Sequence, residues 1–371
     1  MKQTALHAVH AALGAKLIEF GGWSMPVQYG PILDEAQCVR SSAGLFDLGH
    51  MGRVHVSGPD TLRFLDKVCT NFVAKIPVGA IRYSLFCRAD GNPIDDLLVY
   101  REKDSVYLVI NAGNTAVDLA WLREQARGFA VTIDDQTERT GMLALQGQRA
   151  HEVLQTLVTG LDLATIGYYK FSFGTVCGLP NTRLSRTGYT GEDGFEIYLD
   201  NADCVRVWNA VLEAGRAAGV RPIGLGARDI LRLEAGMPLY GHEIDEDTDP
   251  ISAGLGFAVK LDKGQDDERA GRFIGQDALQ RIAAAGPARK LVGLVLEGRR
   301  SARQGMQVKH GNDVVGRVTS GCLSPTLDKP IAMAFVDASL AEVGTSLSVD
   351  LGRESANATV TKMPFVSATR S

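Results

Sequence analysis

Alternating apolar and polar residues mark three short strands that follow one another between residues 81 and 111. The segments are RYSLFCRADG (82–91), PIDDLLVYRE (93–102) and SVYLVINAG (105–113). Short apolar runs bounded by Gly, Asp and Asn are typical of β-hairpins. The pattern therefore predicts an antiparallel meander.

Helical periodicity appears on both sides of this meander. Segment 57–69 opens with Ser-Gly-Pro-Asp before apolar residues at helical spacing, and segment 114–128 places Val117 and Trp121 on one face. A second group of helices and strands follows: helix 147–157, strands 182–190 and 194–199, and helices 202–219 and 226–236. Strands and helices mixed in this way favour an α+β fold with antiparallel sheets.

Beyond residue 262 the pattern changes. Polar residues 262–272 read as a linker or surface loop, and a short helix at 274–286 ends in Gly-Pro. Only short strands come after it: 290–298, 307–311, 313–321, 331–337, 346–352 and 357–363. Six short strands with Gly-rich turns predict a small closed barrel.

Composition narrows the possible partners. The 371 residues include 39 Lys and Arg against 43 Asp and Glu, a net charge of −4, which gives no positive field for nucleic acid or an anionic membrane. The six cysteines stand singly, which argues against a disulfide framework and fits a reducing compartment. No membrane span or targeting presequence is evident, so we expect a cytoplasmic chain, or a mature mitochondrial matrix form whose targeting peptide was removed.

The strand NPIDDLLVY carries two adjacent carboxylates, Asp95 and Asp96, within an otherwise apolar run. Neighbouring residues of a strand point to opposite faces, and neither face here is plainly polar. At least one carboxylate is therefore expected in a dry place, where it must be hydrogen-bonded, paired or used in chemistry. The simpler interpretation is that both are solvated or accept hydrogen bonds from turn amides.

Two further stretches hold candidate chemistry. RTGYTGEDGFEIYL (186–199) surrounds Tyr189 with glycines that permit close backbone approach or positive φ, and Glu196 follows in a strand where alternation favours an exposed side chain. Arg228 and Arg232 stand four apart on a helix and form either a paired cationic site or a surface salt-bridge ladder. The seven histidines show no metal-binding spacing, and no P-loop or GxSxG motif is present.

Taken together, seven segments resemble the T-protein family of the glycine cleavage system, the tetrahydrofolate-dependent aminomethyltransferases. They follow the family's order from residue 20 to residue 365 and so cover nearly the whole chain. The segments are FGGWSMPVQYG, GLFDLGHMG, IDDL, RTGYTGEDGFE, GLGARDILRLEAGMPLYGHEID, VTSGCLSPTL and KMPF.

The resemblance implies an α+β fold in which a folate-binding body and a C-terminal β-barrel pack like a cloverleaf around a central folate cavity. The body is expected over 1–275, with one subdomain from 1–51 and 140–243 intertwined with a second from 54–139. The barrel is expected over 285–371. Some members end in an aromatic segment where this chain ends in SATRS, which leaves the contribution of the tail to the folate site open.

The resemblance also implies a reaction. In this family an aminomethyl group arrives on the lipoyl arm of the H-protein, ammonia leaves, and the carbon passes to tetrahydrofolate, giving 5,10-methylenetetrahydrofolate. Residue-by-residue matching makes Asp95 the expected catalytic carboxylate, as a proton acceptor and stabiliser of the cationic carbon, and makes Asp96 much less important. The matched folate-binding residues are Met51, Tyr83, Asn111, Tyr189, Glu196 and Arg228. The partners are tetrahydrofolate and the lipoylated H-protein, and no metal is expected.

Two alternatives on the same fold stay open at this point. One is a folate-dependent demethylase of a small methylated compound, because substrate pockets diverge faster than scaffolds. The other is a non-enzymatic folate-binding accessory protein, like the iron–sulfur cluster maturation factors. Those proteins carry a K-G-C-[YF]-T-G-Q-E type of motif, whereas this chain has RTGYTGEDGFE without a cysteine.

Overall fold

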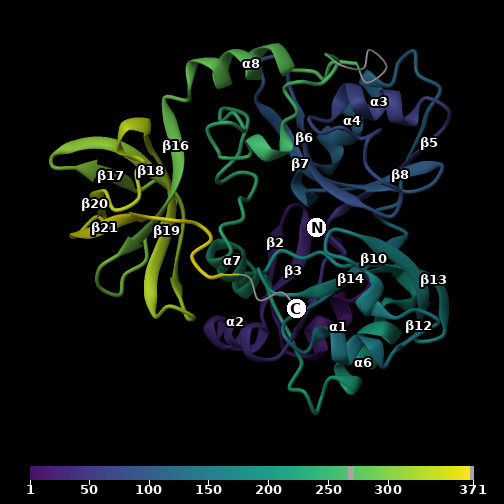
Figure 1. The fold of residues 1–371 in the computed structure, drawn as a ribbon. Helices are drawn as coiled ribbons and strands as arrows, with labels where there is room; N and C mark the ends of the chain where they lie inside the picture. The colour runs from purple at the N-terminus through teal and green to yellow at the C-terminus, as the bar shows by residue number, and fades with distance from the viewer. Residues whose placement is uncertain (266–270, 368–371) are drawn as a thin grey trace.

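Three lobes pack around one centre in the computed structural model, which describes residues 1–265 and 271–367. Figure 1 shows two lobes that mix helices and strands, with the C-terminal strands forming the third lobe. The larger mixed lobe combines strands from both sides of the chain segment that forms the smaller mixed lobe, so it contains residues that are far apart in sequence.

The larger sheet has seven strands in the order β11-β12-β13-β14-β10-β4-β15. Its apolar core includes Phe195 and Trp208, and helices α5 (Ala150–Gln155) and α6 (Cys204–Ala214) pack on it. The strands are β4 (Gly44–Asp47), β10 (Thr140–Gln146), β11 (Val158–Thr159), β12 (Phe171–Val176), β13 (Leu179–Ser185), β14 (Gly194–Asp200) and β15 (Arg221–Pro222).

The second sheet has five strands in the order β6-β7-β8-β5-β9. Its strands are β5 (Gly52–Ser57), β6 (Ile81–Cys87), β7 (Pro93–Arg101), β8 (Ser105–Ile110) and β9 (Thr132–Asp135). β6, β7 and β8 pair antiparallel in sequence order, which confirms the predicted meander. All five strands lie between β4 and β10 in the chain, so this sheet is an insertion into the larger one. The domain boundaries expected from the sequence stay a prediction.

Helices α3 (Thr61–Val68) and α4 (Thr115–Gln125) share an apolar core with the five-stranded sheet. The prediction that Val117 faces this core was wrong, because 58% of its surface is exposed. The buried face of α4 carries Leu119, Leu122 and the carboxylate of Asp118. The prediction failed because the polar residue Asp118 lies on the buried face of α4, where the sequence pattern led us to expect an apolar residue.

Helix α7 (Leu225–Glu234) joins the body to the barrel. Its Glu234 accepts hydrogen bonds from Arg40 of the body and from Ser324 and Thr326 of the barrel side. Such a buried, fully bonded carboxylate fixes the angle between the lobes. The remaining N-terminal elements are β1 (Lys2–Gln3), α1 (His7–Ala12), β2 (Lys16–Phe20), β3 (Trp23–Gln28) and α2 (Ile32–Ser41).

The C-terminal lobe is a closed six-stranded barrel, as the strand pattern predicts, in the order β16-β19-β18-β17-β20-β21. Helix α8 (Gln276–Ala285) precedes it. The strands are β16 (Arg289–Leu296), β17 (Gln307–His310), β18 (Asp313–Ser324), β19 (Lys329–Asp337), β20 (Ser346–Asp350) and β21 (Ser355–Thr361). After β21 the chain leaves the barrel, and Met363 returns to the centre of the molecule.

The polar segment 262–272 lies partly outside the described residues, and the tail from residue 368 lies entirely outside them. Within its described part, the expected surface loop was wrong at Lys263, which is fully buried. The Lys263 ammonium group pairs with Asp66 at 3.0 Å and donates to two backbone carbonyl oxygens, so its charge is compensated. Among the described helices, none has the length and apolar character needed to cross a lipid bilayer.

Candidate active site

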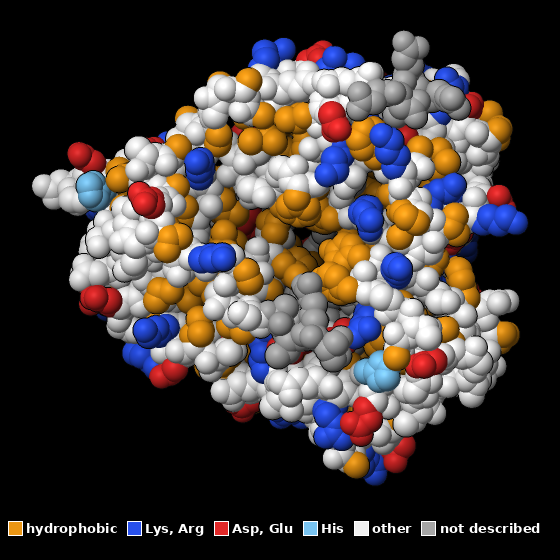
Figure 2. Space-filling view, viewed as in Figure 1, with side chains coloured by type: hydrophobic (Ala, Val, Ile, Leu, Met, Phe, Trp, Pro, Cys, Tyr) orange, Lys and Arg blue, Asp and Glu red, His pale blue; other side chains and the backbone are white. Residues whose placement is uncertain are grey.

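A cavity of about 550 Å³ lies where the three lobes meet. This volume suits one small-molecule ligand. Figure 2 shows the hollow at the centre of the molecule with hydrophobic side chains in its walls. Six of the seven residues expected at the site line it: Met51, Tyr83, Asn111, Tyr189, Glu196 and Arg228. Asp95 does not line the cavity, whereas its neighbour Asp96 does.

Successive side chains of a strand point to opposite faces, so β7 directs Asp95 and Asp96 to opposite sides of the sheet. Asp96 lies on the face that Leu98 also presents to the cavity, and Asp95 lies on the opposite face, toward helix α4. The sequence predicts this alternation. It does not say which face of the sheet the cavity occupies, and that choice decides which carboxylate can touch a ligand.

Asp95 is fully buried and saturated with hydrogen-bond donors. Asn111 donates to it from its backbone N–H at 2.9 Å and from its side-chain amide at 2.8 Å. The side-chain amide of Asn114 donates at 2.7 Å, and Asp118 of α4 lies beside the same carboxylate. Burial raises the pKa of Asp95 above its usual range, and these contacts offset only part of the rise.

Asp96 is less well satisfied. It accepts one side-chain hydrogen bond at 2.8 Å, from the same Asn111 amide that holds Asp95, and the Tyr83 hydroxyl lies beside it. Burial, and then the charge of Asp95, raise the pKa of Asp96 to about 7, although Tyr83 and Asn111 lower it. A carboxylate with this pKa can both accept and release a proton near neutral pH.

Glu196 is buried, so the exposed side chain favoured by strand alternation was wrong. The face of β14 that alternation assigns to solvent is covered by the other lobes. Four hydroxyl groups lie within hydrogen-bond distance of one oxygen, Oε2, at 2.6 to 3.3 Å: those of Tyr100, Ser185, Thr187 and Tyr198. The Tyr100 and Tyr198 hydroxyls also bond to each other, as do those of Ser185 and Thr187, so the four form a network around this oxygen. Within the described chain no donor reaches Oε1, and the residue lines the cavity. One oxygen is therefore fixed, and the other is available to a ligand.

Arg228 and Tyr189 form a second polar corner of the cavity. The Arg228 guanidinium lies 4.7 Å from the centre of the Tyr189 ring, and the Tyr189 hydroxyl donates to the Pro238 carbonyl oxygen. No described acidic side chain pairs with Arg228. Arg232, one turn later, is buried and pairs with Glu243 at 2.7 Å. A surface salt-bridge ladder of these arginines is therefore excluded, because α7 lies between the body and the barrel.

Close packing explains why glycines flank Tyr189. A Cβ at Gly188 would lie 1.8 Å from the Gln146 side-chain oxygen, and one at Gly194 would lie 2.4 Å from a backbone oxygen. Gly191 has φ of +78°, which favours glycine. The motif therefore brings Tyr189 and Glu196 close to β10 without steric conflict.

Several residues of the site have no individual signal in the sequence. Phe257 stacks on Tyr83 with ring centres 5.8 Å apart, and 65% of its surface is exposed. His50 is buried in the wall, with no described partner for its Nδ1 atom. Met363 reaches the cavity from beyond the barrel. These residues come from distant segments, so only the tertiary packing brings them together.

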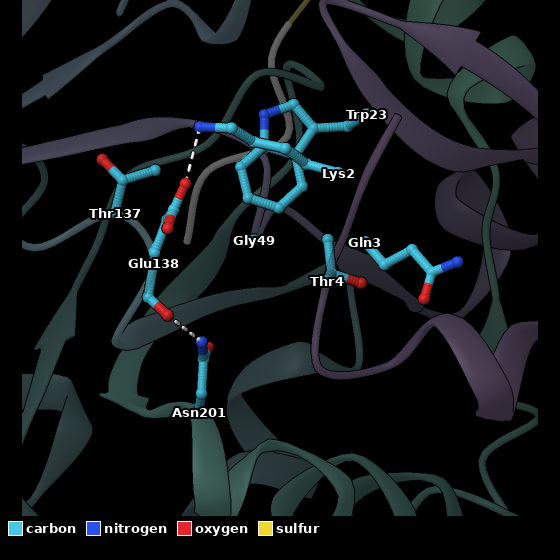
Figure 3. Close-up of a pocket in the computed structure, with 8 residues that line it drawn as sticks. All are labelled: Lys2, Gln3, Thr4, Trp23, Gly49, Thr137, Glu138 and Asn201. Atoms are coloured by element: carbon cyan, nitrogen blue, oxygen red, sulfur yellow. Dashed lines mark hydrogen bonds and ion pairs between the residues drawn. The ribbon is translucent and has the colours of Figure 1, made fainter.

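A smaller hollow lies near the N-terminus (Figure 3). Lys2 and Glu138 form an ion pair of 2.7 Å across it, and the Lys2 ammonium lies 5.6 Å from the centre of the Trp23 ring. Both charged groups are more than half exposed and neutralise each other. The central cavity, which combines apolar walls with unpaired polar groups, is the stronger candidate site.

Comparisons with known proteins agree along the chain. The family described as the GCVT N-terminal domain matches residues 6–263, and the glycine cleavage T-protein C-terminal barrel domain matches residues 289–367. The chain is 47% identical over 370 residues to an aminomethyltransferase of Symbiobacterium thermophilum, covering 98% of this chain and 97% of that protein. It is 45% identical over 372 residues to an aminomethyltransferase of Geobacillus thermodenitrificans, covering 100% of both.

The structural comparison covers body and barrel together. The crystal structure of glycine cleavage system aminomethyltransferase T from Bartonella henselae superposes with a TM-score of 0.90 and 34% sequence identity, covering 99% of this chain and 98% of that chain. The predicted α+β fold with a C-terminal barrel is therefore confirmed. On sequence and on structure, this chain belongs to the glycine cleavage T-protein family of aminomethyltransferases.

Proposed function

We propose that this aminomethyltransferase takes the one-carbon unit from the aminomethyl-dihydrolipoyl arm of the H-protein and transfers it to tetrahydrofolate. Ammonia is released and 5,10-methylenetetrahydrofolate is formed. The observation that carries the proposal is one cavity with two unlike carboxylates in its wall. Glu196 offers one oxygen without a described donor, and Asp96 has a pKa of about 7. Glu196 therefore suits ligand binding, and Asp96 suits proton transfer.

Glu196 is proposed to hold the pterin ring. Its Oε1 atom can accept the paired donors of the pterin amino group and ring N–H, while four hydroxyls keep the carboxylate in place through Oε2. Arg228 can donate to the neighbouring ring oxygen. Tyr83 and Tyr189 provide flat surfaces for the pterin and aminobenzoyl rings.

Asp96 is proposed to be the catalytic carboxylate, in place of the Asp95 expected from motif matching. Ammonia leaves the aminomethyl carbon, and Asp96 stabilises the resulting cation. One folate nitrogen bonds to this carbon, the carbon–sulfur bond breaks, and the second folate nitrogen closes the ring. Asp96 accepts protons from the nitrogens as they attack, and the two protons end on ammonia and on the thiol of the arm. Asp96 must be ionised for these steps, so activity rises with pH through about 7.

The opening of the cavity fits a carrier-delivered substrate. Phe20 and Phe257 line it while remaining partly exposed, which offers an apolar passage for a lipoyl arm. Figure 2 shows Lys and Arg side chains around the hollow. Such a rim attracts an acidic carrier protein and raises its rate of association. The compartment proposed is the cytoplasm, since the relatives named above are bacterial and all six cysteines are unpaired.

The test is a reconstituted reaction. Purified protein, tetrahydrofolate and H-protein loaded with the aminomethyl arm should release ammonia and form 5,10-methylenetetrahydrofolate in equal amounts. Free aminomethyl-dihydrolipoamide should react with a much lower kcat/KM, because docking makes delivery of the arm nearly unimolecular. Equal kcat/KM for the free and carried arm would favour a small-molecule demethylase.

A further inference from the structure

Asp118 is a buried carboxylate behind the reactive strand with no donor of its own. It stands on α4 and is fully buried, and neither of its oxygens meets a hydrogen-bond donor among the described residues. A charge left in this state is costly enough that the group normally takes up a proton. The carboxylate of Asp95 lies beside it, within hydrogen-bonding reach.

The donors in this cluster are divided unequally. Asp95 accepts three N–H hydrogen bonds, two from Asn111 and one from Asn114. Asn114 is the N-cap residue of α4 and Asp118 lies in the first turn of this helix, so both reach Asp95 from the same end of α4. Three donors stabilise the anion on Asp95, whereas none stabilises an anion on Asp118.

Two carboxylates in contact in a dry site share one proton. We propose that Asp118 is a neutral carboxylic acid whose O–H donates to Asp95, and that it is a positioning residue which keeps Asp95 ionised behind Asp96. Asp95 then has four donors, which leaves its charge fixed and unreactive. That fixed charge is one of the two influences that raise the pKa of Asp96 to about 7.

The charges around Asp118 agree with this protonation. Burial, and then the charges of Asp95 and Asp96 on β7, raise the pKa of Asp118 far above its usual range. From the loop after α7, Tyr240 also faces the cluster, and its hydroxyl donates to the Pro93 carbonyl oxygen at 3.3 Å. Tyr83 faces Asp96 from β6. In the described structure no cation forms an ion pair with Asp118, so nothing opposes the shift.

The protonation state can be tested without any activity. Infrared spectra of the folded protein with isotope-labelled aspartate are recorded at about pH 9, where Asp96, with its pKa of about 7, is ionised. We expect the carbonyl band of a neutral carboxylic acid in the wild type and its loss in Asp118→Asn. A wild type without this band, or a band that persists in Asp118→Asn, would overturn the assignment.

The positioning role is tested by kinetics and rests on the proposed function. In Asp118→Leu the Asp95 carboxylate loses the donor that keeps it ionised, so it takes up a proton more readily and raises the pKa of Asp96 less. The rise of kcat with pH should therefore move to lower pH, in the same direction as in Asp95→Asn and by no more than the shift in that variant. Asp118→Asn supplies an N–H in place of the O–H and should restore most of the wild-type profile. Glu124→Gln, on the exposed part of α4, is the matched control.

The infrared test and the kinetic test can fail independently of each other. An unshifted profile in Asp118→Leu, or an equal shift in Asp118→Asn, would overturn the positioning role, provided thermal unfolding shows both variants folded. Should the chain transfer no aminomethyl group at all, the proposed function fails, while the infrared result still decides whether Asp118 carries the proton.

Discussion

Asp96 on β7 and Glu196 on β14 line the same cavity but are held in opposite ways. Four hydroxyls converge on one oxygen of Glu196, so the carboxylate is fixed. Asp96 accepts one side-chain amide hydrogen and stands next to the negative charge of Asp95. The difference shows how one fold separates two tasks. A carboxylate rich in donors anchors a ligand, whereas one that is poor in donors and beside a like charge can exchange a proton.

The largest expected effect is on Asp96. Asp96→Asn keeps the shape of the side chain and removes its charge, so kcat should fall by about 10²-fold or more while the Kd for tetrahydrofolate changes little. The measurement is the rate of 5,10-methylenetetrahydrofolate formation, with Asp104→Asn in the exposed turn after β7 as the control. Near-wild-type turnover in Asp96→Asn would return the catalytic role to Asp95.

The next effect concerns the anchor. Glu196→Gln keeps one carbonyl oxygen but replaces the other with an amide that repels the pterin donors, so tetrahydrofolate binding should weaken by about 1 to 3 kcal/mol. Calorimetric titration measures this directly, and the exposed Glu124→Gln serves again as a control. Wild-type affinity in Glu196→Gln would remove this residue from the folate site.

A smaller effect is expected from salt concentration, which acts on the charged rim of the cavity and on neither carboxylate. Raising the salt concentration screens the Lys and Arg side chains around the opening, so KM for the H-protein should increase severalfold. The Kd for tetrahydrofolate should stay nearly constant, because its contacts lie inside the cavity. A KM that does not respond to salt would count against docking of an acidic carrier.

The smallest effect is the loss of one of the four hydroxyls on Glu196. Tyr100→Phe should weaken tetrahydrofolate binding by at most about 1 kcal/mol, since three hydroxyls remain within hydrogen-bond distance of Oε2. Tyr107→Phe changes a neighbouring ring in the same core that has no hydrogen bond to Glu196, so it is the matched control. A loss in Tyr100→Phe equal to that in Glu196→Gln would mean that the network, and not the free oxygen, carries the affinity.

Much of the fold follows from the sequence because its signals are local. Strand alternation and turn residues predicted the meander of β6 to β8, and regular short strands predicted the barrel. The same local rules failed at Val117, where a buried polar residue sits on the docked helix face, and at Lys263, whose partners Asp66 and Cys69 lie far away in the sequence.

The site was predicted less completely for a physical reason. Alternation shows that Asp95 and Asp96 point to opposite faces, but only the packing of α4 and the other lobes decides which face is the cavity. Alternation predicted an exposed Glu196 for the same reason, since the surface that covers β14 comes from other segments. The family resemblance found six of the cavity residues, whereas Asp118, His50 and Met363 required the structure.

The central claim is that Asp96 is the ionisable group that controls the reaction and that Asp95 is the fixed charge behind it. The pH dependence of kcat in the wild type, Asp95→Asn and Asp96→Asn tests this most directly. We predict that wild-type kcat rises through about pH 7. The rise should move to lower pH in Asp95→Asn, because removing that charge lowers the pKa of Asp96, and it should disappear in Asp96→Asn. A rise that persists near pH 7 in Asp96→Asn, or that disappears in Asp95→Asn, would contradict the account.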